Sequence, residues 1–170
     1  MKPLHNPHFI EFIVYFNKNQ DFFECHEVLE EYWKSLPDGT KDHPLTGYIL
    51  LSTGMYHWRR GNKIGGLRTL KKAEEKFDAT QEKFPDFMDG IDFNNMCHKL
   101  QQAILNIEND QPFTSFSIVV TSETIISLVN KIESQIELLP FGSDAVIHKH
   151  MLRDRSSILR LREEKKKGRY

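Results

Sequence analysis

The segment from Pro44 to Arg60 is apolar around almost its whole circumference when it is wound as an α-helix. Large apolar side chains fall on every face of it: Leu45, Tyr48, Ile49, Leu50, Leu51, Met55, Tyr56 and Trp58. A helix with this pattern is normally covered by other elements on all sides. Two glycines, Gly47 and Gly54, would allow neighbouring helices to approach closely. We therefore expect a central, buried helix with the rest of the chain packed around it.

Most of the remaining chain also has helical periodicity. The pattern predicts helices over residues 7–18, 22–36, 62–84, 93–108 and 123–139, and a last helix that opens at Ser143-Asp144. Residues 116–120 (FSIVV) are strand-like but have no obvious second strand, so we expect an extended segment packed on the helices. The sequence thus predicts an all-α fold, a single multihelical bundle of six to seven helices. We assign residues 1–145 to the bundle and residues 146–170 to a C-terminal basic helix and tail of the same domain.

Composition limits the class of protein. A chain of 170 residues suits one domain with a real core. Cys25 and Cys97 form no CxxC motif, which fits a reducing cytosol. Neither a signal peptide nor an apolar run of membrane-spanning length is evident, so we expect a cytoplasmic protein that does not enter a membrane.

Charge is distributed unevenly along the chain. Residues 1–148 carry 14 basic and 21 acidic side chains, whereas residues 149–170 carry 9 basic and 3 acidic ones. The basic tail lacks interleaved aromatic residues, so we do not expect nucleic acid as a partner. A small-molecule ligand and a protein partner both stay open, as does the oligomeric state.

Polar residues that could take part in binding or catalysis gather in the sequence DFFECHEVLEEYWK, residues 21–34. Asp21 suits a helix N-cap, and Glu24 three residues later completes a capping box. In the helix that follows, His26 lies within the apolar face and Glu30 is its neighbour one turn on. We therefore expect His26 and Glu30 to point inward and Glu31 to face solvent.

Two runs, FFECHEVLEEYWK at residues 22–34 and YHWRRGN at residues 56–62, resemble a family of small bacterial helical proteins known as domain-of-unknown-function family 309. The resemblance covers roughly residues 10–80, and the run HKHMLRDR at residues 148–155 is similar to an extension of its Bacillus-type members. It implies an all-helical bundle and a bacterial origin, and it brings no established activity. The motif residues that carry over are Glu24, His26, Glu27, Glu30, Trp33, Gly47, His57, Gly61 and Asn62. The family often has Gln where this chain has Leu50, which implies an altered site if that Gln binds a ligand.

The histidines and carboxylates permit two kinds of site. His57 shares a helical stripe with Thr46, Leu50 and Thr53, and could approach His26 if the two helices pack antiparallel. In one interpretation, the side chains of His26, Glu30 and His57 satisfy one another in a buried network beside Trp33. In the other, these three residues bind a divalent metal, because HEVLE resembles the zinc motif HExxH with Glu30 in the place of the second His.

From these patterns we predict a helical binding or interaction module. Its polar cluster would line or support a small pocket and consist of Glu24, His26, Glu27, Glu30, Trp33, His57 and Asn62. The alternative is a metal-dependent hydrolase that uses His26, Glu30 and His57 as ligands, with Glu27 as a possible base. Cys25 adjoins His26 in sequence but would point about 100° away from it on a helix, so we expect a core residue and not a nucleophile.

Overall fold

The computed structural model describes residues 1–37 and 41–148, and within them the chain is helical with no β-strand. The α-helices are α1 (Pro7–Val14), α2 (Phe22–Ser35), α3 (Pro44–Arg59), α4 (Lys63–Thr80), α5 (Phe93–Glu108), α6 (Glu123–Gln135) and α7 (Asp144–Ile147). Shorter turns are η1 (Pro3–His5), η2 (Tyr15–Asn19) and η3 (Pro85–Phe87). The predicted all-α fold is confirmed.

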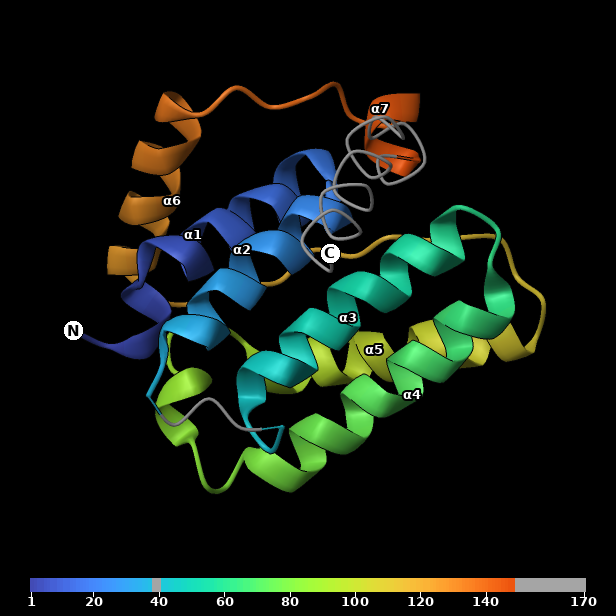
Figure 1. Cartoon of the computed structure of the whole chain (residues 1–170), viewed down its shortest axis with the longest axis horizontal. Helices are drawn as coiled ribbons and strands as arrows, with labels where there is room; N and C mark the ends of the chain where they lie inside the picture. Colours follow the sequence, from blue (N-terminus) through green and yellow to red (C-terminus); the bar gives the residue numbers. More distant parts are fainter. Residues whose placement is uncertain (38–40, 149–170) are drawn as a thin grey trace, which may run out of the picture.

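Helix α3 lies at the centre of the bundle, as its sequence predicts. It has more buried residues than any other helix described: Pro44, Leu45, Gly47, Tyr48, Leu51, Ser52, Gly54, Met55, Tyr56 and Trp58. Figure 1 shows α3 between α2 and α4, with α1 on the far side of α2. Phe9, Phe12 and Phe77 surround the ring of Tyr48 with edge-on contacts. An aromatic core of this kind buries a large apolar area.

Glycines set the close packing of α3 against α4. A Cβ atom added at Gly54 would lie 2.5 Å from a methyl group of Leu70, and one at Gly47 would lie 2.6 Å from the ring of Phe77. The turn between the two helices passes through Gly61 at φ +93°. Asn62 then caps α4, since its Oδ1 accepts from the Gly65 amide at 3.0 Å.

The start of α2 has the predicted cap. The Oδ1 atom of Asp21 accepts from the amide of Glu24 at 3.2 Å. Just before it, the chain widens into the π-helical turn η2 and turns sharply at Gln20, which has φ 55°. The predicted helix over residues 7–18 is therefore regular only as far as Val14.

The other predicted boundaries are close to the observed ones. Four helices end earlier than their patterns suggest, at Ser35, Arg59, Thr80 and Gln135. The segment 116–120 is extended, and Val120 forms an isolated antiparallel bridge with Ile91. The last predicted helix begins as α7, while the rest of the C-terminal helix and tail lies outside the described residues.

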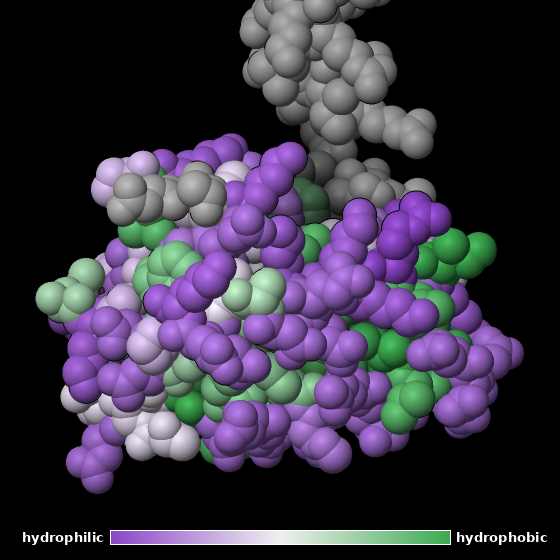
Figure 2. All heavy atoms as spheres, turned by 90° about the horizontal axis from the view of Figure 1, so that it is seen from below, coloured by the Kyte–Doolittle hydropathy of each residue, from purple (hydrophilic) through white to green (hydrophobic). Residues whose placement is uncertain are grey.

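The surface in Figure 2 is largely hydrophilic, with smaller groups of apolar side chains between the polar ones. Among the described residues, exposed large apolar side chains include Ile64 and Leu105. In residues 1–37 and 41–148, no helix combines the length and the apolarity that crossing a bilayer requires.

Candidate functional site

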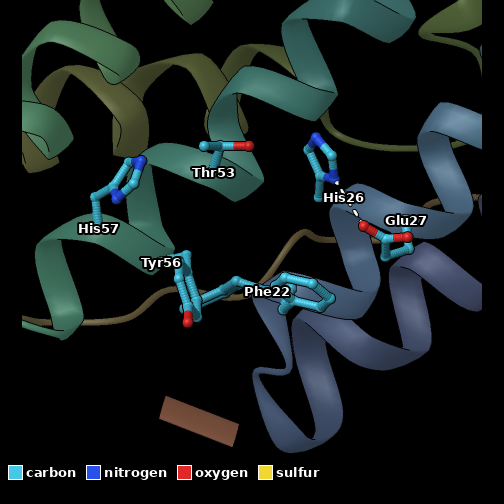
Figure 3. Close-up of a pocket in the computed structure, with 7 residues that line it drawn as sticks. Phe22, His26, Glu27, Thr53, Tyr56 and His57 are labelled. Carbon is cyan, nitrogen blue, oxygen red and sulfur yellow. Dashed lines mark hydrogen bonds and ion pairs between the residues drawn. The ribbon is translucent and has the colours of Figure 1, made fainter. Parts of the chain in front are cut away.

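A pocket of about 200 Å³ opens between the first half of α2 and the second half of α3. We call it the imidazole pocket, and its lining residues are Phe22, Phe23, His26, Glu27, Thr53, Tyr56 and His57. Figure 3 shows the imidazole rings of His26 and His57 coming from different helices, with Tyr56 and Phe22 on a third side. Its walls are mostly aromatic, and polar atoms stand at a few points only. Such a lining is typical of small ligand sites.

His26 is held by two carboxylates of its own helix. Its Nδ1 atom lies 3.4 Å from Oε1 of Glu27, and its Nε2 atom lies 3.4 Å from Oε2 of Glu30. Glu30 also accepts a hydrogen bond from Lys34 at 2.6 Å, and this bond, more than His26, lowers the pKa of the Glu30 carboxyl. A ring between two carboxylates is fixed in orientation, and it can donate to both of them when protonated.

The expectation that His26 and Glu30 point into the core is wrong. Their side chains are 33% and 34% exposed, so they stand on the rim of the α2–α3 seam. The helix buries a neighbouring stripe instead: Phe22, Cys25, Val28, Leu29 and Tyr32. Helix α2 turns this stripe toward α1 and α3, and His26 falls at its edge. Glu31 is exposed, as predicted.

His57 lies on the opposite side of the pocket and has a different partner. Its Nδ1 atom lies 3.5 Å from Nδ2 of Asn62, the residue that caps α4. Since the amide nitrogen is a donor, Nδ1 of His57 acts as the acceptor, and the neutral ring carries its proton on Nε2. Burial, together with the positive charge of Arg60, lowers the pKa of His57. The ring is therefore neutral at physiological pH.

The structure brings only part of the predicted cluster into contact. His26 and Glu30 are neighbours as expected, whereas His57 pairs with Asn62 and not with a carboxylate. Within residues 1–37 and 41–148, no group of three or more His, Cys, Asp and Glu side chains is placed to hold a metal ion. The three ligands expected for a divalent metal are therefore not brought together in the described part of the chain.

Comparisons with known proteins place the chain in a family. The model of a domain of unknown function, DUF309, matches residues 9–69. The uncharacterized protein YpuF of Bacillus subtilis is 30% identical over 162 residues, which cover 92% of this chain and 91% of YpuF. This chain belongs to the DUF309 family. No protein of solved structure matches it.

The residues that resemble the DUF309 motif divide into two groups in the fold. His26, Glu27 and His57 line the imidazole pocket, and Asn62 holds His57. Glu24 does not line it. Its negative charge acts instead on Glu11 of α1 and on Tyr15 of η2, and burial together with this charge raises the pKa of Tyr15 to about 12.

Trp33 and Glu30 line a second hollow of about 230 Å³, which we call the tryptophan pocket. Its other lining residues are Lys41, Thr46, Ile49, Leu50 and Lys76. Leu50, where the resemblance led us to expect a polar Gln, thus adds an apolar wall to this pocket. The predicted stripe of Thr46, Leu50, Thr53 and His57 on α3 runs through both pockets.

Sequence reasoning missed the aromatic walls of the imidazole pocket. Phe23 and Tyr56 lie edge to face, with ring centres 6.1 Å apart. Both residues were visible only as members of apolar runs. Their part in a pocket depends on how α2 and α3 align, which periodicity within one helix does not specify.

Proposed function

We propose that this DUF309 protein is a binding module whose imidazole pocket receives an apolar group of its ligand. The observation that carries this proposal is the pairing of aromatic walls with two imidazoles that have separate partners on opposite sides of one pocket. Transfer of an apolar group from water into this pocket would contribute favourable binding free energy. The neutral His57 ring could donate a hydrogen bond from Nε2 to a polar edge of that group.

The size of the pocket limits what can enter it. Its volume of about 200 Å³ lies below the roughly 300–1,000 Å³ typical of sites for drug-sized molecules. The pocket therefore suits one ring or one branched side chain and not a whole metabolite. A side chain of a protein or peptide is one source of such a group.

Binding is favoured over catalysis by the partners of the polar groups. The hydroxyl of Thr53 is hydrogen-bonded to the carbonyl of Ile49, one turn back in α3, at 3.0 Å. His57 pairs with the capping residue Asn62, and Glu30 pairs with Lys34. These contacts stabilise helices and orient rings, and they do not activate a nucleophile. We also place the protein in the cytoplasm, since Cys25 and Cys97 are unpaired.

The test is a titration of the full chain with p-cresol and with indole, followed by amide NMR. Saturable shifts centred on the amides of His26, Thr53 and His57 are expected at millimolar probe. A Thr53→Phe variant should lose them, because its ring would fill the pocket. The exposed Thr121 offers a matched control, and Thr121→Phe should keep them. Shifts that persist in Thr53→Phe, or that centre elsewhere, would overturn the proposal.

A further inference from the structure

The turn between α3 and α4 fixes His57 and Asn62 against each other. The backbone amide of Asn62 donates to the carbonyl of His57 at 2.9 Å, and the loop that this bond closes passes through Gly61 at φ +93°. The side-chain atom Nδ2 of Asn62 lies 3.5 Å from Nδ1 of His57. The turn itself therefore places the two side chains together, whatever the packing of α2 on α3.

The amide group of Asn62 has a fixed orientation. Its Oδ1 atom accepts from the amide of Gly65 at 3.0 Å, as the cap of α4. A backbone N–H is only a donor, so the oxygen of the side chain, and not its nitrogen, faces Gly65. Gly65 also leaves room for this group, because a Cβ atom there would lie 2.5 Å from Nδ2 of Asn62. The cap therefore turns Nδ2, a donor, toward Nδ1 of His57.

This arrangement selects one tautomer of His57. A proton on Nδ1 would face the amide hydrogens of Asn62, donor against donor, whereas a bare Nδ1 accepts from them. At 3.5 Å the hydrogen bond is long, but the charges on the facing atoms favour the same tautomer. The proton of the neutral ring is therefore on Nε2. Figure 3 shows the outer nitrogen of this ring directed toward Thr53, on the wall of the imidazole pocket.

Polar groups elsewhere on the pocket wall have partners of their own. The hydroxyl of Thr53 donates to the carbonyl of Ile49 at 3.0 Å. The carboxylate of Glu27 lies 3.4 Å from Nδ1 of His26. In residues 1–37 and 41–148, by contrast, Nε2 of His57 has no hydrogen-bond partner. Its N–H is thus a donor that a ligand can use.

We infer that Asn62 determines which ligands the imidazole pocket accepts. By holding His57 with the Nε2 proton outward, it selects an apolar group that carries a hydrogen-bond acceptor, such as a carbonyl oxygen or a pyridine-type nitrogen. A group whose polar edge is a donor is disfavoured. Asn62 is a positioning residue, since it does not line the pocket and acts through His57. The inference rests on the proposed function, and it names the class of ligand for the same pocket.

Asn62→Asp tests the inference and keeps the cap, because Asp caps helices as well as Asn does. A carboxylate only accepts, so it should draw the proton of His57 to Nδ1 and leave Nε2 as an acceptor. The measurement is a long-range proton–nitrogen NMR spectrum of the histidine rings in the full chain, at pH 9 so that the imidazole is neutral. Wild type should show the Nε2–H tautomer, and Asn62→Asp the Nδ1–H tautomer. The same tautomer in both proteins would overturn the inference.

Two control variants separate the tautomer from the cap and from the added charge. Asn62→Ser keeps a capping side chain but has no carboxylate. Ile64→Asp adds the same charge in the first turn of α4, at a side chain that is 77% exposed and lines neither pocket. Both controls should keep the Nε2–H tautomer. The Nδ1–H tautomer in Ile64→Asp would overturn the inference, because charge alone would then explain the result with Asn62→Asp.

Titrations of the full chain at the same pH measure the ligand preference. The probes are γ-picoline, whose ring nitrogen only accepts, and indole, whose N–H only donates. From wild type to Asn62→Asp, the affinity for γ-picoline divided by that for indole should fall about tenfold or more, since one probe loses a hydrogen bond and the other gains one. Asn62→Ser should change this ratio by less than about threefold. An unchanged ratio in Asn62→Asp would overturn the inference.

The same experiments distinguish failure of this inference from failure of the proposed function. If Thr53→Phe abolishes binding of both probes but Asn62→Asp leaves their affinity ratio unchanged, the acceptor preference fails and the pocket function stands. If neither probe gives saturable shifts at His26, Thr53 and His57 in the wild type, the proposed function fails and the ligand class fails with it. A reversed tautomer in Asn62→Asp would then still show that Asn62 orients His57.

Discussion

The guanidinium carbon of Arg59 lies 4.6 Å from the centre of the Phe22 ring. The same group donates to the carbonyl of Gln20 at 2.6 Å and to the carbonyl of Val146 at 3.3 Å. Burial lowers the pKa of Arg59 to about 10, so it remains charged at physiological pH. One side chain at the end of α3 therefore joins the turn at Gln20, α2 and α7 beside the imidazole pocket.

Replacing this cation should destabilise the fold. Arg59→Leu leaves two partly buried carbonyls without their charged donor and removes a buried cation that packs on Phe22, so we expect a loss of about 2–4 kcal/mol in the free energy of unfolding. Urea unfolding followed by circular dichroism measures it. Arg68→Leu, at an exposed position on α4, should change stability by less than about 0.5 kcal/mol. Similar losses for both variants would contradict the role of Arg59.

The contact of Gly54 with Leu70 predicts a steric penalty. In Gly54→Ala the new methyl group would meet the Leu70 side chain at 2.5 Å and its backbone nitrogen at 3.2 Å. We expect a loss of about 1–3 kcal/mol, typical of overpacked cores. A double-mutant cycle with Leu70→Ala should show that the smaller side chain relieves part of this loss. If the stability losses of Gly54→Ala and Leu70→Ala simply add in the double variant, the new methyl group does not clash with the Leu70 side chain.

Removing His26 should have a small effect on stability. A buried network would lose 1–3 kcal/mol, but His26 and its two carboxylates are at least one-third exposed. Exposed ion pairs contribute about 0–1 kcal/mol. We therefore expect His26→Ala to lower the free energy of unfolding by less than about 1 kcal/mol. A loss above 2 kcal/mol in urea unfolding would restore the buried-network interpretation.

Stability should fall as the pH drops below about 6.5. Burial lowers the pKa of both His43 and His57 below the value of 6.5 in the unfolded chain. Below pH 6.5 the unfolded chain therefore binds more protons than the folded chain. The contribution of the two histidines to the free energy of unfolding is complete above pH 6.5 and is lost as the pH falls toward their pKa values in the folded chain. Urea unfolding between pH 7.5 and 5.0 measures the slope. His57→Gln should flatten it, and an unchanged slope would show that His57 does not contribute.

The amino-acid sequence determined the helices and the central place of α3. Apolar side chains lie at every angle around residues 44–60, so this helix has no face suited to water and must be covered by other elements. The pattern can be recognised from this segment of the sequence alone. The caps at Asp21 and Asn62 were also predictable, since each bonds an amide three residues away. Helix ends such as Thr80 and Gln135 were harder to predict. Residues just inside and just outside a helix end have similar local preferences, so the sequence leaves the end uncertain by a few residues.

Tertiary structure decided which motif residues share a site. His26 and His57 lie on one pocket, yet each has a separate partner, and Glu24 faces α1. Phe23 and Tyr56 became walls only because α2 and α3 align in one particular register. That register depends on packing between the two helices, just as the close fit of Gly54 against Leu70 sets the position of α4 on α3. Contacts between distant segments depend on volume and shape at both partners, and neither helix alone encodes them.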